Sequence, residues 1–109
     1  MNWTDEVKLE LARAKEAQRG GNMGRVRTSA RRAVGTAIAE LQKRIPDKHY
    51  GRDFITQLRT LAHDDDVPEK VRNAADRLQA RLSPAFESPS LHPLEDAEII
   101  IQFVFERLS

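Results

Sequence analysis

Arginine is the residue type in this chain with the most evident chemical use. Seven Lys and Arg side chains lie between residues 13 and 32, and Glu16 is the one acid among them. Guanidinium groups donate paired hydrogen bonds to phosphate and carboxylate oxygens, and nucleic acids offer a continuous row of phosphates. The segment therefore predicts an anion- or nucleic-acid-binding surface. Its candidate contacts are Arg25, Arg27, Ser29, Arg31 and Arg32.

The charge distribution supports a second interpretation of the same arginines. Residues 1–52 hold twelve Lys and Arg against six Asp and Glu, whereas residues 53–109 hold six against eleven. Basic and acidic helices would attract one another within one chain or across a dimer. The arginines also lack interleaved aromatic side chains, on which bases stack in many nucleic-acid-binding proteins. Ion pairs within the protein, an acidic protein partner, and nucleic-acid or nucleotide phosphates all stay open.

The three histidines give little support for catalysis or for a metal centre. No two of His49, His63 and His92 lie three or four residues apart, as helical metal ligands do. Three aspartates follow His63, but this run lacks the spaced ligands of a calcium loop. Arg59 and His63 are the weak catalytic candidates, because histidine can serve in acid–base chemistry. We expect no metal ion and no cofactor.

Other catalytic signatures are absent from the sequence. The chain has no cysteine, which excludes disulfides and thiol chemistry. Its serines lie outside any nucleophile-elbow motif, and no glycine-rich phosphate loop is present. The glycines at positions 20, 21 and 24 follow a predicted helix rather than a strand, so they indicate a turn between helices.

Helices must position these side chains, because strand signals are almost absent. Helical spacing of apolar residues predicts helices over about 5–19, 23–45, 52–63, 67–82 and from about 93 onward. Thr4, Asn22 and Asp66 are the expected N-caps, since short polar side chains accept the first free backbone N–H groups of a helix. A Gly-Gly pair ends the first helix, and a Pro- and Ser-rich connection precedes the last one.

The apolar positions of the second helix form one arc at 100° per residue. Arg25, Ser29 and Arg32 fall on the opposite arc, where we expect them to face solvent. Arg27 and Arg31 fall beside the apolar arc, so their stems can lie on apolar surface while their charged ends reach water.

The last helix is the most apolar of the five. Ile99 to Ile101 and Phe103 to Phe105 cover more than half of its circumference. A helix of this kind lies centrally in a bundle or is also buried in an oligomer. We therefore predict a single all-α domain over residues 1–109. Its architecture is an up-and-down bundle of four to five helices that forms a homodimer.

Hydropathy predicts a protein of the cytoplasm without membrane contact. No apolar run approaches the roughly 20 residues that a membrane span requires. The first ten residues carry acids where a signal peptide would carry basic residues and then an apolar stretch.

The order and texture of the helices resemble the HEPN family of small helical-bundle proteins. The matching segments are KLELARAKEAQ, the turn RGGNMGR, the helix RTSARRAVGTAIAEL and the terminal DAEIIIQFVFERL. The resemblance implies two long antiparallel helices followed by shorter ones, with frequent dimerisation. It also implies a protein partner that is often encoded nearby.

Catalytic HEPN members are ribonucleases with an arginine, four to six residues and then a histidine. Three residues separate Arg59 from His63 here, and ten separate Arg81 from His92, so neither pair matches. The resemblance therefore implies a noncatalytic interaction module whose arginine-rich face contacts an acidic partner or phosphates. The alternatives are a divergent ribonuclease that uses Arg59 and His63, and a purely structural dimerising bundle.

Overall fold

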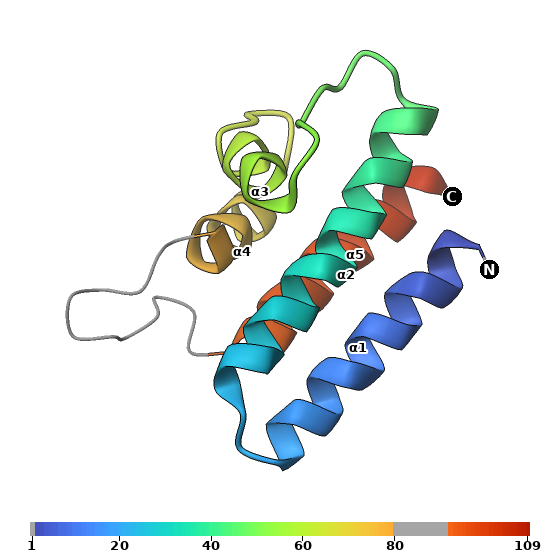
Figure 1. Ribbon diagram of the computed structural model, residues 1–109. Helices are drawn as coiled ribbons and strands as arrows, with labels where there is room; N and C mark the ends of the chain where they lie inside the picture. Colours follow the sequence, from blue (N-terminus) through green and yellow to red (C-terminus); the bar gives the residue numbers. More distant parts are fainter. Residues whose placement is uncertain (1, 80–91) are drawn as a thin grey trace.

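The described part of the chain folds into five helices that pack as an all-α bundle (Figure 1). The computed structural model describes residues 2–79 and 92–109, and within these ranges it contains no strand. The helices are α1 (Trp3–Arg19), α2 (Met23–Arg44), α3 (Phe54–Ala62), α4 (Glu69–Gln79) and α5 (Pro93–Leu108). The predicted fold class is thus confirmed. The predicted end of the fourth helix at Leu82 and most of the Pro- and Ser-rich connection lie outside the described residues.

The N-terminal cap of α1 differs from the prediction. Asn2, rather than Thr4, caps the helix, because its Oδ1 atom accepts from the backbone N–H of Asp5 at 2.9 Å. Thr4 lies inside the first turn and donates its hydroxyl to the same Oδ1 atom at 2.6 Å. The helix therefore starts two residues earlier than expected.

The turn between α1 and α2 follows the sequence closely. Gly21 has a φ of 75°, a conformation that glycine adopts without the steric cost of a side chain. Asn22 caps α2 as predicted, since its Oδ1 atom accepts from the backbone N–H of Arg25 at 3.1 Å. The result is a tight antiparallel hairpin of the two longest helices (Figure 1).

The start of α4 is a second departure from the predicted caps. The helix begins at Glu69, and the carbonyl of Pro68 accepts the first backbone hydrogen bonds, from Val71 and Arg72. Asp66 does not cap it, because its carboxylate instead accepts from Lys48 Nζ at 2.7 Å. An ion pair with the preceding loop has therefore taken the side chain that the sequence assigned to the helix.

Helix α2 lies at the centre of the bundle and packs against both α1 and α5. Leu94, at the start of α5, packs on the cluster formed by Ala14, Ala17 and Val26. At the other end of α5, the ring of Phe105 lies 5.0 Å from that of Trp3 in α1. These contacts make α5 parallel to α2, so the alternating direction of the chain is interrupted by the short pair α3 and α4 (Figure 1).

The main core joins buried aliphatic and alanine side chains of α2 to those of the other helices. Its largest fully buried members include Val34, Ile38, Leu41, Leu58, Leu61, Leu78, Ile100 and Val104. Gly35 marks the closest approach of α3 to α2, since a Cβ atom there would lie 3.1 Å from the Cβ atom of Phe54. Small residues on α2 thus let its neighbours lie near its backbone.

Polar contacts fasten α4 to both α5 and α2. The guanidinium of Arg77 binds Asp96 of α5, with its Nη2 atom 2.7 Å from Oδ1. The Nε atom of Arg31 on α2 donates to the carbonyl oxygen of Leu78 at 2.8 Å. In the described part of the chain, none of the helices is long and apolar enough to cross a membrane.

Candidate functional site

The four arginines in the first half of α2 divide into two pairs. Arg25 and Arg32 are seven residues apart, which places them on one side of the helix, about 10 Å apart along its axis. Both are exposed to solvent. Arg27 and Arg31 are half-buried on a different side, which agrees with the division that the helical arc predicted.

The side of α2 that carries Arg31 is occupied by the structure itself. Burial, followed by repulsion from Arg27, lowers the pKa of the Arg31 guanidinium. Arg31 stabilises the last turn of α4 through its bond to Leu78, where helix carbonyls carry partial negative charge. The buried Nε atom of Arg27 makes no hydrogen bond within residues 2–79 and 92–109. Arg31 therefore belongs to the packing between α2 and α4, and Arg27 lies close enough to affect its pKa.

Ser29 does not belong to an exposed face, and its predicted exposure is wrong. Only 3% of the residue is accessible to solvent. It lies one turn after Val26 and one turn before Ala33, both of which are buried, so its small side chain sits at the edge of the packed arc. The hydroxyl of Ser29 is therefore not available to a bound anion.

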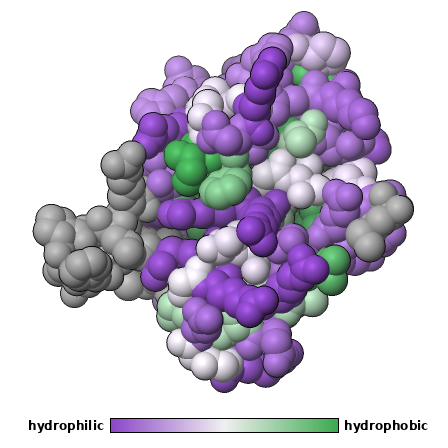
Figure 2. Space-filling model, viewed as in Figure 1, coloured by the Kyte–Doolittle hydropathy of each residue, from purple (hydrophilic) through white to green (hydrophobic). Residues whose placement is uncertain are grey.

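Arg13 of α1 lies near Arg25, and we call Arg13, Arg25 and Arg32 the basic face. Arg13 and Arg25 line one hollow of about 300 Å³ at the turn between the helices, together with Asn22 and with Glu16, which is paired with Arg19. Arg13 is bonded to Glu10 at 2.8 Å. Arg25 and Arg32 make no ion pair with any described residue. In Figure 2, hydrophilic residues cover most of the face formed by α1 and α2, and a hydrophobic patch lies over α3.

The acidic half of the chain, residues 53–109, makes its described ion pairs with other cations. Its carboxylates bind cations outside the basic face, in the pairs Lys48–Asp64, Lys48–Asp66, Arg72–Asp65 and Arg77–Asp96. Neutralisation by the acidic half therefore does not account for Arg25 and Arg32.

A second candidate site is an open groove of about 470 Å³ beside α3. The loop between α2 and α3 forms one wall, and the exposed side of α3 with the turn after it forms the other. The groove is lined by Asp47, Lys48, His49, Tyr50, Arg59, Thr60, His63 and Asp64. It thus contains both weak catalytic candidates, Arg59 and His63, and brings them beside residues from a distant part of the sequence.

The side chain of Gln42 on α2 holds the loop wall in place. Its Oε1 atom accepts from the backbone N–H groups of Tyr50 at 2.7 Å and Gly51 at 3.1 Å. Its Nε2 atom donates to the carbonyl of Gly51 at 2.9 Å. Gly51 has a φ of 121°, which few other residues adopt, and a Cβ atom there would lie 2.6 Å from Thr56.

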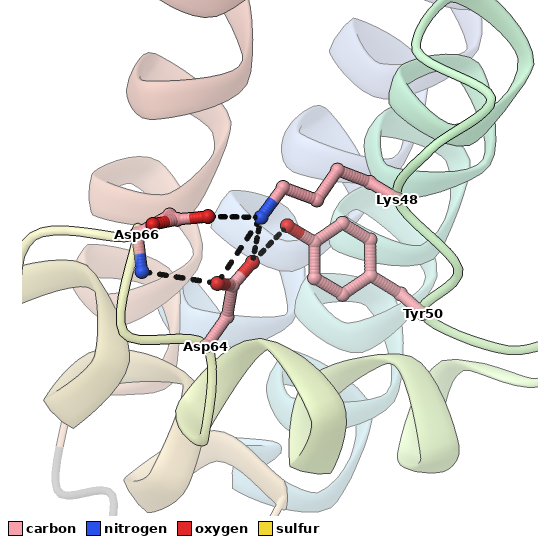
Figure 3. A network of polar contacts seen from close by, with 4 residues as sticks. All are labelled: Lys48, Tyr50, Asp64 and Asp66. Carbon is pink, nitrogen blue, oxygen red and sulfur yellow. Dashed lines mark hydrogen bonds and ion pairs between the residues drawn. The ribbon is translucent and has the colours of Figure 1, made fainter.

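Asp64 organises one half of the groove (Figure 3). Its carboxylate accepts from the Tyr50 hydroxyl at 2.6 Å, from Lys48 Nζ at 3.2 Å and from the Asp66 backbone N–H at 3.0 Å. Burial alone would raise the pKa of Asp64, but these hydrogen bonds together hold it below its usual value. Burial and the bond to Asp64 raise the pKa of the Tyr50 phenol. The bonds to Asp66 and Asp64 raise the pKa of Lys48.

The other half of the groove holds side chains with unused hydrogen-bonding atoms. The Nδ1 atom of His63 lies 2.8 Å from the carbonyl oxygen of Arg59. A carbonyl oxygen can only accept, so Nδ1 carries the hydrogen and the Nε2 atom stays available. Arg59 donates its Nε atom to Gln79 Oε1 at 3.2 Å and keeps its terminal amino groups. His49 is exposed and makes no hydrogen bond with the described residues.

Sequence reasoning found Arg59 and His63 but not the residues that meet them. His49 and Asp47 are ten or more residues away in the sequence, and no local motif connects them to α3. Tyr50 is the one tyrosine of the chain, and its ring is part of the core. Within the described ranges, no three His, Asp or Glu side chains are grouped so that they could hold a metal ion.

Comparison of the chain with family models, with curated proteins and with solved structures finds no match. The resemblance to the HEPN family therefore stays a prediction. The basic face and the groove are therefore the two regions of the structure that bear on function.

Proposed function

We propose that this protein is a noncatalytic, cytoplasmic interaction module of the HEPN type that binds the phosphate backbone of RNA through its basic face. One observation carries the proposal: Arg25 and Arg32 are exposed on one side of α2 and have no ion-pair partner among the described residues. An arginine can hold a phosphate through two parallel N–H···O bonds.

The surface around these arginines favours a phosphate backbone over a protein partner. Protein interfaces usually have an apolar centre, whereas backbone binding needs cationic donors and no apolar contact. Among the described residues, the exposed large hydrophobic side chains are Leu9 (41%) and Met23 (39%), and neither lines the hollow between Arg13 and Arg25. An acidic protein surface is the alternative ligand of the same face.

The test is a titration of a labelled single-stranded RNA at low and at moderate salt. Each arginine that contacts a phosphate of a single strand contributes about 0.7 to the slope of log K against log salt. We expect the double variant Arg25→Gln, Arg32→Gln to bind about tenfold more weakly and to lower that slope by about 1.4.

A matched control removes two positive charges elsewhere. Arg52 and Lys70 are exposed, and neither makes a hydrogen bond or ion pair with a described residue. The double variant Arg52→Gln, Lys70→Gln should keep most of the affinity. Equal losses in the two double variants would show that only net charge matters, and no binding at low salt would exclude RNA. Binding to an acidic peptide but not to RNA would favour the protein partner.

The groove supports a second candidate, a divergent ribonuclease. The observation in its favour is that His63 presents its Nε2 atom in the same groove that His49 and Arg59 line, as an acid–base site for phosphodiester cleavage requires. An RNA degradation assay on the wild type and on His63→Ala tests this. Equal cleavage by both would show that the activity comes from another site or from contamination.

The homodimer stays part of the proposal. The apolar residues at the flanks of α5 are only half-buried in one chain, and they include Ile99, Phe103, Phe105 and Leu108. Light scattering measures the mass directly. A monomer at all concentrations would leave α5 with a purely internal role and would exclude the dimerising alternative.

A further inference from the structure

We infer that the groove beside α3 binds a phosphate-type oxyanion through His49, Arg59 and His63, and that it does so only when the two imidazoles are protonated. This site is separate from the basic face, and the inference does not depend on RNA binding there. The ligand class is a tetrahedral anion with several acceptor oxygens, either a free ion or a phosphate monoester.

The donors for a ligand come from both walls of the groove. Arg59 and His63 are four residues apart, so they lie on the same side of α3. The Arg59 carbonyl occupies Nδ1 of His63 at 2.8 Å, which leaves Nε2 as the atom for a ligand. The terminal amino groups of Arg59 are also unused, because only its Nε atom is bonded, to Gln79. His49 adds a third donor from the opposite wall.

The charged groups in the Asp64 half of the groove are already paired with one another. Lys48 is held by two carboxylates, those of Asp64 and Asp66, so it is not a free cation and these three groups together are negative. The Asp64 carboxylate accepts from Tyr50, Lys48 and the Asp66 amide, and both of its oxygens are occupied. These bonds fill the Asp64 half of the groove, and a ligand has to bind at the other half.

The charge of the ligand-binding half of the groove depends on its histidines. Arg59 and Asp47 are both exposed and offset each other. Arg107 of α5 faces Tyr50 from another side and belongs to a different pocket. The two histidines therefore decide the net charge. Protonation of the two imidazoles is what makes this half of the groove positive.

The side chains of this half of the groove suit an anion better than a metal ion. Metal binding would require several neutral or negative ligands, and the guanidinium of Arg59 would repel the cation. The described residues contain no group of three His, Asp or Glu arranged for a metal. Two imidazolium groups and one guanidinium instead match the oxygens of a phosphate or a sulfate.

The test follows the imidazole NMR signals of all three histidines in the intact protein. Sodium sulfate is the probe, because sulfate keeps both charges over the whole range and any pH effect belongs to the protein. At about pH 5.5, sulfate should shift the signals of His49 and His63 saturably, and at about pH 8 it should bind at least tenfold more weakly. His92 lies at the start of α5, beside Glu95 and Glu98, and is the internal control.

Three variants complete the test. His63→Gln and His49→Gln should each weaken sulfate binding about tenfold, the effect of losing one charged hydrogen bond. His92→Gln should leave sulfate binding unchanged. The double variant Arg25→Gln, Arg32→Gln should also leave it unchanged, which separates this site from RNA binding at the basic face. His63 and His49 are exposed, so their replacement should not unfold the protein.

The inference is overturned if His92 shifts as much as the other two, if the shifts do not saturate, or if affinity is the same at both pH values. A last comparison identifies the source of the ligand. Oligonucleotides with and without a 5′-phosphate are added to the wild type at about pH 5.5. A stronger shift from the phosphorylated strand indicates an RNA end, whereas equal effects with tight phosphate binding indicate a free ion.

Discussion

Arginine has opposite roles at two places in this molecule. Between α4 and α5, Arg77 binds Asp96 through two nitrogens, and only 5% of Asp96 is exposed. This bond raises the pKa of the Arg77 guanidinium. On the basic face, Arg25 and Arg32 point to solvent without an acidic partner among the described residues. Burial and an available carboxylate, rather than residue type, therefore decide whether an arginine stabilises the fold or can bind a ligand.

The largest expected effect on stability is at the buried carboxylate. Asp96→Ala leaves Arg77 without its charged hydrogen bonds, and we expect the free energy of unfolding to fall by about 2 kcal/mol. The value is kept moderate because the Arg77 side chain is 42% exposed and water can solvate it. Urea denaturation measures the change. Glu98→Ala, an exposed position on the same helix, is the control, and equal results for both variants would remove the distinction between the two regions.

The next effect concerns the Asp64 half of the groove. Tyr50→Phe keeps the buried ring and removes the hydroxyl that donates to Asp64. We expect a loss of about 1 kcal/mol in the free energy of unfolding, as for one intramolecular hydrogen bond. The same substitution in an Asp64→Asn background should cost less, because the two groups interact. Additive losses would mean that the bond contributes nothing to folding.

The pH dependence of stability should reveal the same carboxylate. The folded pKa of Asp64 is lowered, so its contribution is present above the unfolded value, about 3.9, and is lost as pH falls through the folded pKa. The wild type should therefore be more stable than Asp64→Asn near neutral pH, and the gap should narrow below about pH 4. Urea denaturation of both proteins at several pH values measures the gap. A gap that widens in acid would contradict the assignment.

The smallest expected effect on stability lies on the basic face. Because no described residue pairs with Arg25 or Arg32, the double variant to glutamine should change the free energy of unfolding by less than about 0.5 kcal/mol. The same variant should lose about tenfold in RNA affinity. A large loss of stability in urea would place these residues with Arg77, as part of the structure, and would remove the contrast.

Periodicity predicted the helices because each depends on local spacing of apolar residues. The five helices, the Asn22 cap and the division of the α2 arginines all follow from this regularity. Positions at the margin of an arc are harder. Ser29 is polar and was placed outside, but Val26 and Ala33 on either side of it are buried and carry it into the packed region.

The caps and the groove depended on contacts that local rules do not contain. Asp66 is a good N-cap by type, yet Lys48, eighteen residues earlier, competes for its carboxylate. The groove joins a loop at residues 47–50 to the last turn of α3. Its geometry is determined by the path of that loop, which Gln42 of α2 fixes through its bonds to Tyr50 and Gly51.

The contacts of Gln42 with Tyr50 and Gly51 have a further consequence. These bonds join an uncharged amide to backbone groups, so neither ionic strength nor acidity changes their charge. The Gln42 bonds to the loop wall thus do not respond to salt or pH, whereas the ion pairs of Lys48 with Asp64 and Asp66 do. Salt would regulate the basic face, and protons would regulate the groove. Salt concentration and pH would then act on two different ligand sites of the same protein.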